Sequence, residues 1–262
     1  MFRIICLLIG YVFGMFQTSY IVGRMNGIDI REHGSKNAGF TNTNRVLGMK
    51  KGIIVFVIDI FKAIAAFVVA TLVYNHFFAI ELFSFVTSDG YVVRPHFPYS
   101  LFAGGTFFAS YHVLPGLYAG IGAILGHCFP FYLKFRGGKG VACALGLIIM
   151  LDWRITLISF TIGLIAVLIT KFISVASLLI TLSVPILMFL LNFPVVVNGI
   201  SPQEWHSLGF TMPDLQSYFR NPVEGVWLMT ALCAFVWFLH RDNIKRLLSG
   251  TENKFSFKRK VS

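Results

Sequence analysis

The stretch FRGGKG at residues 135–140 combines three glycines and two cations, a composition typical of sites that bind phosphate. Glycine lets the backbone approach a ligand closely, and Lys139 adds a positive charge. A nucleotide-binding P-loop requires G-x-x-x-x-G-K-[ST], but Leu133 stands at the first glycine position and Gly140 at the hydroxyl position. The spacing therefore excludes a nucleotide loop. The apolar run that follows predicts a helix whose N-terminus favours an anion, although a basic turn beside a membrane is the alternative interpretation.

A second polar segment, REHGSKNAGFTNTNRVLG at residues 31–48, mixes hydroxyls, amides and cations among three glycines. Glycine exposes backbone N–H groups, which can form an anion-binding nest. A polar connecting loop is the alternative for this segment alone. The candidate anion-binding residues here are Gly34, Ser35, Lys36, Asn37, Thr41, Asn42 and Arg45.

The third polar segment, HRDNIKRLLSGTENKF at residues 240–255, follows the last apolar run. His240 and Asn243 are three residues apart, so they share a face of a helix beside the membrane. Gly250 is typical of a helix C-cap, and Glu252 is expected to pair with a cation from another segment. A basic amphipathic helix lying on lipid explains this segment equally well when it is taken alone.

The elements that position these segments are membrane helices. Of the 262 residues, 56% are hydrophobic and only 13% are charged, against about 25% in soluble domains. This composition predicts an all-α polytopic membrane protein with one domain over residues 1–262. The first apolar run is expected to be a retained span, because no small-residue cleavage site follows it. Seven runs are candidate spans: 4–23, 53–80, 111–126, 140–151, 155–170, 173–193 and 225–239.

The distribution of Lys and Arg predicts which side of the membrane each segment faces. With seven spans, 17 of the 22 Lys and Arg residues fall on one side, in segments 24–52, 127–139, 171–172 and 240–262. Cytoplasmic loops carry such an excess, so the N-terminus is predicted outside and the C-terminus inside. The three polar segments then share the cytoplasmic face. The net charge of +11 is explained by topology and anionic lipid, without nucleic acid.

Other stretches inside and between the spans predict local structure. LDWRI at residues 151–155 interrupts an apolar stretch too short for two full spans, so we expect a hairpin of two short helices. Residues 81–110 and 194–224 are expected to be outer loops. GLYAGIGAILG at 116–126 predicts close helix packing through small residues. The cysteines are expected to be buried thiols rather than disulfide partners or metal ligands: Cys6, Cys128, Cys143 and Cys233.

Two charged residues lie inside a predicted span. Asp59 and Lys62 are three residues apart and therefore share one helix face. Charges within a membrane are candidates for function. A structural ion pair is an equally good interpretation, and the sequence leaves both open.

The three polar segments together resemble the PlsY family, the acyl-phosphate:glycerol-3-phosphate acyltransferases of bacterial membranes. The family patterns G-S-x-N-P-G-x-T-N-x-x-R, G-H-x-F-P…F-[KR]-G-G-K-G-V-A and H-x-x-N-I-x-R-L-x-x-G-x-E correspond to GSKNAGFTNTNR, GHCFPFYLKFRGGKGVA and HRDNIKRLLSGTE. Ala38 replaces the proline of the first pattern, and Lys36 stands where glycine is usual. The order and spacing of the three segments also agree with the family.

The resemblance implies an enzyme of the bacterial cytoplasmic (inner) membrane with seven spans and a site facing the cytoplasm. It would transfer a fatty acyl group from acyl phosphate to the sn-1 hydroxyl of glycerol 3-phosphate, giving lysophosphatidic acid and inorganic phosphate. No cofactor, metal or obligate protein partner is implied. The implied catalytic residues are Ser35, Arg45, Lys139, His240 and Asn243. The implied substrate-binding residues are Gly34, Lys36, Asn37, Thr41, Asn42, Arg136, Gly137, Gly138, Gly140, Arg246 and Glu252.

The general base stays open at this point. His240 has a suitable ordinary pKa, but it could equally donate to a phosphate, and the resemblance suggests that the phosphate of the acceptor takes the proton. His127 is expected to hold the turn. The seven histidines include none with an aspartate five residues later, which argues against acyl-CoA chemistry based on H-x-x-x-x-D. A transporter of a phosphorylated small molecule and a lipid-binding scaffold are the competing functions.

Overall fold

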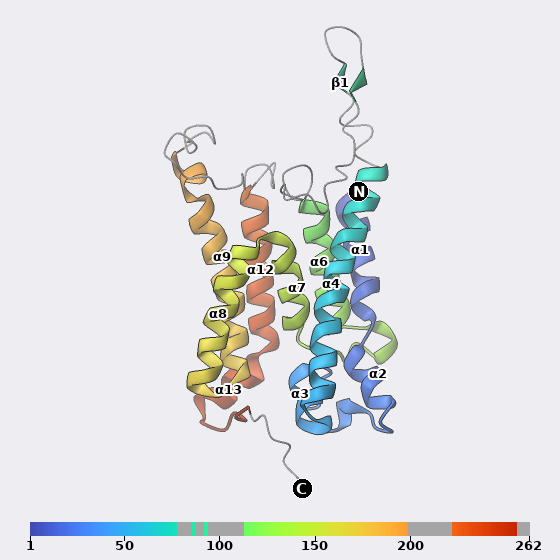
Figure 1. Cartoon of the computed structure of the whole chain (residues 1–262), viewed down its shortest axis with the longest axis vertical. Helices are drawn as coiled ribbons and strands as arrows, with labels where there is room; N and C mark the ends of the chain where they lie inside the picture. Colours follow the sequence, from blue (N-terminus) through green and yellow to red (C-terminus); the bar gives the residue numbers. More distant parts are fainter. Residues whose placement is uncertain (78–84, 87–91, 94–112, 199–221, 256–262) are drawn as a thin grey trace.

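The computed structural model describes residues 1–77, 85–86, 92–93, 113–198 and 222–255. Within them the chain is a bundle of helices that run along its longest axis (Figure 1). The N-terminus lies at one end of the bundle, and the short helices α2 (Thr18–Arg24), α3 (Phe40–Leu47) and α13 (Arg241–Leu248) lie towards the other. The polar segments 31–48 and 240–255 therefore sit at the same end.

Apolar helices form the body of the bundle. Five described segments are long and apolar enough to cross a membrane: Phe2–Arg24, Met49–Tyr74, Leu114–Leu133, Trp153–Thr170 and Ile173–Leu190. Two shorter apolar helices, Val141–Leu151 and Glu224–Leu239, accompany them. These segments belong to α1 (Phe2–Met15) with α2, α4 (Met49–Phe77), α6 (Val113–Cys128), α7 (Val141–Leu151), α8 (Trp153–Thr170), α9 (Ile173–Asn198) and α12 (Pro222–Leu239). The prediction of a helical, multi-pass membrane protein is confirmed.

The prediction of two helices over residues 140–170 is confirmed, but only α7 is short, because α8 is long enough to cross a membrane. α7 ends at Leu151 and α8 begins at Trp153, with Asp152 between them. The Asp152 carboxylate accepts hydrogen bonds from the backbone N–H groups of Arg154 (2.7 Å) and Ile155 (3.3 Å), which caps α8. The acid in LDWRI is therefore the residue that starts the second helix.

The polar segments and the turn before FRGGKG contain four short helices: η1 (Ile30–Glu32), α3, η2 (Phe131–Leu133) and α13. α13 confirms the helix expected before Gly250, whereas the other three were not predicted. The first apolar run is also not one helix, because α1 stops at Met15 and α2 starts at Thr18. Of the expected outer loops, 81–110 contributes only the antiparallel strands β1 (Phe85–Val86) and β2 (Val92–Val93), and 194–224 only helix ends; the remainder lies outside the described residues.

α7 occupies the middle of the bundle and contacts α4, α6, α8 and α9. Eight of its eleven residues are buried, as expected for a helix that is apolar on every side. FRGGKG directly precedes this helix, so the central position of α7 brings Gly138 and Gly140 into the bundle interior, while Phe135 and Arg136 stay exposed. The four cysteines are free and buried, as predicted.

Glycine allows α1 and α6 to pack with their backbones in contact. A Cβ atom at Gly10 would lie 1.8 Å from the Ala119 carbonyl oxygen, and one at Gly122 would lie 2.1 Å from the Leu7 carbonyl oxygen. Both distances are far below van der Waals contact, so each glycine is required by the backbone opposite. The predicted small-residue packing of 116–126 is thereby confirmed.

We expect Gly122→Ala to separate α1 from α6 and to destabilise the protein by about 1–3 kcal/mol, the usual cost of overpacking. The measurement is thermal unfolding of the purified protein in detergent. Gly163→Ala is the matched control, because its new methyl group would meet the end of the Ile180 side chain, which can move. Equal melting temperatures for the two variants would contradict this explanation.

Candidate active site

The segment FRGGKG folds back onto the end of α6. Lys134 and Phe135 adopt positive φ angles of 56° and 58°, which reverse the chain after η2. The backbone N–H groups of Gly137 and Gly138 then donate to the carbonyls of Cys128 (3.1 Å) and His127 (3.0 Å). A Cβ atom at Gly138 would lie 2.0 Å from Nε2 of His127, so only glycine fits there.

This folding changes which N–H groups are available to a ligand. The resemblance implies that Gly137, Gly138 and Gly140 bind substrate, but the N–H groups of Gly137 and Gly138 are already used within the chain. The N–H groups of Lys139 and Gly140 have no acceptor among the described residues. Gly140, with φ of 78°, is the N-cap of α7, so these two N–H groups lie at the positive end of the central helix.

The third polar segment supplies a chain of contacts to Lys139. The Lys139 ammonium donates to Oδ1 of Asn243, and Nδ2 of Asn243 donates to Oε1 of Glu252 at 2.8 Å. Arg246 donates to Oε2 of the same carboxylate at 2.7 Å, and Ser174 on α9 donates to Oε1 at 3.2 Å. Because a carboxylate only accepts, Glu252 fixes the orientation of the Asn243 amide and turns its oxygen towards Lys139.

The end of α13 explains why Glu252 returns to its own helix. The N–H of Gly250 donates to Leu247 (3.2 Å) and that of Thr251 to Arg246 (2.8 Å), with Gly250 at a φ of 69°. This is a Schellman motif, and the predicted role of Gly250 is confirmed. The expected partner of Glu252 was wrong: its cation is Arg246 of the same segment, because the reversed chain brings position 252 back beside position 246.

The electrostatics of the site affect Lys139 and His240 in the same direction. Burial, followed by the charge of Arg246, lowers the pKa of Lys139 to about 8. Burial, followed by the charge of Lys139, lowers the pKa of His240 to about 4. His240 is therefore neutral near pH 7. Its Nδ1 lies 2.8 Å from the Val236 carbonyl, which can only accept, so the lone pair is on Nε2.

The polar segment 31–48 is held against FRGGKG and the turn before it. The N–H of Ala38 donates to the Gly137 carbonyl at 3.4 Å, and Arg31 donates to the Leu133 carbonyl at 3.0 Å. Asn42 is buried and binds only the chain around it, accepting from the Ser35 N–H (2.7 Å) and donating to the carbonyls of Ile30 and His33. A Cβ atom at Gly34 would lie 2.4 Å from Asn42 Oδ1, so this glycine makes room for the amide.

The other candidate side chains of the first two segments remain available to a ligand. They make no hydrogen bond or ion pair within the described part of the chain: Ser35, Lys36, Asn37, Thr41, Arg45 and Arg136. The structure thus separates the predicted site residues into those that build the loops and those that the loops present. It brings Lys139, Asn243, Arg246 and Glu252 into one network.

Comparison with known proteins agrees with this arrangement. The family model described as glycerol-3-phosphate acyltransferase matches residues 4–250. The glycerol-3-phosphate acyltransferase of Mycoplasmopsis agalactiae is 35% identical over 97% of this chain and 94% of its own length. The chain belongs to the PlsY family. It is therefore an integral-membrane acyltransferase of lipid biosynthesis, and the transporter and scaffold alternatives are set aside.

Further PlsY relatives match over almost the whole chain. The glycerol-3-phosphate acyltransferase of Shouchella clausii is 31% identical over 96% of this chain and 95% of its own length. A crystal structure of PlsY (YgiH), an integral membrane glycerol 3-phosphate acyltransferase, in its glycerol 3-phosphate form, has a TM-score of 0.66 and 25% identity. That comparison covers 97% of this chain and 96% of the other.

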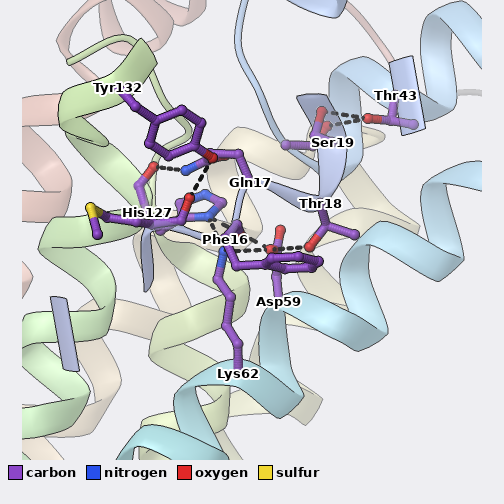
Figure 2. A network of polar contacts seen from close by, with 11 residues as sticks. Phe16, Gln17, Thr18, Ser19, Thr43, Asp59, Lys62, His127 and Tyr132 are labelled. Atoms are coloured by element: carbon purple, nitrogen blue, oxygen red, sulfur yellow. Dashed lines mark hydrogen bonds and ion pairs between the residues drawn. The ribbon is translucent and has the colours of Figure 1, made fainter. Parts of the chain in front are cut away.

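The sequence left open a structural ion pair of Asp59 and Lys62 and predicted that His127 holds the turn, and both are confirmed. It did not predict that these residues meet in one polar cluster (Figure 2). The buried side chains of Thr18, Asp59, Lys62 and His127 are joined by hydrogen bonds and an ion pair. Ligand atoms of Asp59, His127 and Cys143 lie within 4.8 Å of one another, a spacing that suits a metal ion. The Lys62 ammonium contacts both Asp59 and His127, so a metal ion would have to displace it.

We expect Glu252→Ala to lower the thermal stability of this protein, because Asn243, Arg246 and Ser174 would lose a charged acceptor. Hydrogen bonds to charged groups each contribute about 1.5–3 kcal/mol, and partial exposure of Arg246 favours the lower end. The measurement is the unfolding midpoint in detergent. Glu32→Ala, which removes an exposed acid, is the control. An unchanged midpoint for Glu252→Ala would contradict the network.

Proposed function

We propose that this enzyme uses acyl phosphate as the donor and the sn-1 hydroxyl of glycerol 3-phosphate as the acceptor, giving lysophosphatidic acid and inorganic phosphate. The observation that carries the proposal is that the N–H groups of Lys139 and Gly140, which have no acceptor in the described chain, lie beside the half-buried, cationic side chain of Lys139. Such a group of donors suits a phosphate. A donor that already carries phosphate needs no cofactor to activate its carbonyl.

In this proposal, one set of groups binds phosphate oxygens and another orients glycerol 3-phosphate. Lys139, Arg45 and the N–H groups at the start of α7 bind phosphate oxygens, with Lys36 or Arg136 assisting. Ser35 and Asn243 orient glycerol 3-phosphate. The hydroxyl oxygen attacks the acyl carbon, the bond from that carbon to the phosphate oxygen breaks, and the electron pair leaves with phosphate. Aligning the two substrates in this way supplies roughly 7–11 kcal/mol.

The proton of the attacking hydroxyl is proposed to go to the phosphate of the acceptor rather than to His240. A phosphate monoester has a second pKa of about 6. The pKa of His240 is lowered to about 4, so the phosphate is the stronger base near neutral pH. His240 instead accepts a hydrogen bond at Nε2 and orients the substrate.

The proposed topology has seven spans with the N-terminus outside and the site facing the cytoplasm of a bacterial inner membrane. The seven apolar segments of the described chain support this number. The position of α13 at the end opposite the N-terminus also supports an odd number of crossings (Figure 1). An acyl chain would then remain in the lipid while its phosphate reaches the aqueous side.

We expect the purified enzyme to release inorganic phosphate and form lysophosphatidate only when acyl phosphate and glycerol 3-phosphate are both present. Lys139→Ala should lower kcat/KM by about 10²–10³-fold, the usual effect of removing a donor that stabilises a developing negative charge. Lys134→Ala removes an exposed cation from the same loop and is the control. Activity on acyl-CoA without activity on acyl phosphate would refute the donor, and full activity of Lys139→Ala would refute that assignment.

The pH dependence gives a separate test of Lys139. Its pKa of about 8 means that the ammonium is charged below pH 8 and neutral above it. Because kcat/KM reports the ionisation of the free enzyme, we expect kcat/KM to fall as the pH rises through about 8. In Lys139→Arg this fall should move to higher pH, since a guanidinium stays charged. If kcat/KM falls at the same pH in both proteins, a group other than residue 139 titrates.

A further inference from the structure

The break in the first membrane segment creates polar groups that must be satisfied inside the bundle. α1 ends at Met15 and α2 begins at Thr18, so the Phe16 carbonyl is free of the helical hydrogen-bond ladder. The Lys62 ammonium donates to this carbonyl at 2.9 Å, and the Thr18 hydroxyl donates to Oδ1 of Asp59 at 3.1 Å. A polar group left unpaired in an apolar membrane would cost several kcal/mol. The Asp59–Lys62 pair on α4 therefore matches the break in its neighbour.

The same ammonium determines the orientation of His127. Lys62 has three N–H donors, and they are directed at Asp59 Oδ1 (2.8 Å), the Phe16 carbonyl (2.9 Å) and Nδ1 of His127 (2.9 Å). Since an ammonium cannot accept, Nδ1 of His127 is the acceptor and the imidazole proton lies on Nε2. Lys62 is only 6% exposed and His127 only 3%, so no bulk water replaces these contacts.

His127 contacts the FRGGKG segment through both its backbone and its ring. Its carbonyl accepts from the Gly138 N–H at 3.0 Å and from the Gln17 side chain. Its Nε2 lies where a side chain at Gly138 would be, since a Cβ atom there would come within 2.0 Å. Figure 2 shows His127 between Gln17 and Lys62, with Asp59 alongside. Lys139 is the next residue after Gly138.

From these contacts we propose that His127, fixed by the Asp59–Lys62 pair, is a positioning residue that sets the place of Gly138 and hence of the Lys139 donors. The inference rests on the proposed role of Lys139 in binding phosphate. His127 does not touch the substrate in this account. It acts through the glycine that it packs against, and a loosened ring would let the loop move away from the phosphate.

The kinetic test is a double-mutant cycle of His127→Ala and Gly138→Ala. Each single change should lower kcat/KM by about ten- to a hundredfold, because a small misplacement of catalytic groups has effects of this size. The kcat/KM of the double variant should be no lower than about that of the less active single variant, since both changes disturb the same contact. Tyr118→Phe, which removes a hydrogen bond from the same helix to Glu224, is the control and should keep wild-type kinetics.

Two kinetic results would overturn the proposal. One is a double variant whose loss equals the product of the single losses, which would mean that His127 and Gly138 act independently. The other is a His127→Ala enzyme with a lower melting temperature but wild-type kcat and KM, which would leave His127 a purely structural role.

A second readout does not depend on activity. Cys128 and Cys143 are 3% and 0% exposed, and Cys128 Sγ lies near the position that a Gly140 side chain would take. If His127 holds the loop, His127→Ala should increase maleimide labelling of these two thiols, measured by mass spectrometry. Cys6 and Cys233 provide internal references, and Tyr118→Phe should label as the wild type does.

The two readouts separate this inference from the proposed donor. A wild-type enzyme inactive on acyl phosphate would refute the proposed function, whereas the labelling would still report on the loop. Labelling of Cys128 and Cys143 at the wild-type rate in His127→Ala would overturn the positioning role, even if acyl phosphate proves to be the donor.

Discussion

A charge buried in an apolar bundle must have a partner for every donor, and the Lys62 ammonium meets this requirement with three different parts of the chain. It contacts Asp59 on its own helix, the Phe16 carbonyl at the end of α1, and His127 near the end of α6. Unpaired, such a charge would cost several kcal/mol. Three membrane segments therefore meet at one ammonium, and the loop that follows α6 begins where they meet. The turn that carries FRGGKG is therefore tied, through the His127 carbonyl and the Gly138 N–H, to this polar junction.

The polar motifs divide into residues that shape the loops and residues that the loops present. Asn42 is buried and uses its whole amide within the chain around it, and Glu252 binds three side chains of α13 and α9. Gly137 and Gly138 are glycines because His127 occupies the space beside them. Arg45 and Ser35, by contrast, are exposed and without side-chain partners in the described chain. Membership of a motif therefore does not by itself mean that a residue binds substrate. Residues that shape the loops are buried and use their hydrogen-bonding groups within the chain, whereas residues that the loops present are exposed and do not.

The sequence predicted what depends on local pattern and missed what depends on distant contacts. Apolar runs located the membrane helices, and the acid in LDWRI located the hairpin because Asp152 caps the helix that follows it. The break at Phe16 carries neither proline nor glycine, and its partner Lys62 is 46 residues away. The contact between Gln17 and His127 spans 110 residues. The sequence could show that Asp59 and Lys62 share a helix face, but a structural and a catalytic pair look alike until the neighbouring helices are in place.

The lengths of α7 and α8 place Lys139 deeper inside the bundle than the other polar segments. α8 has 18 residues and is therefore about 27 Å long, while α7 has 11 residues and is about 16 Å long. Both helices start from the turn at Asp152 and run back towards the same end, so α7 stops about 10 Å short of the level that α8 reaches at Thr170. The backbone of Lys139 is consequently recessed within the bundle, and its side chain extends to Asn243 on α13. This depth explains why His240 is buried and Lys139 half-buried although both lie outside the membrane helices, and why their pKa values fall. In the proposed function, this depth would let the carbonyl end of an acyl chain meet the Lys139 donors without leaving the lipid.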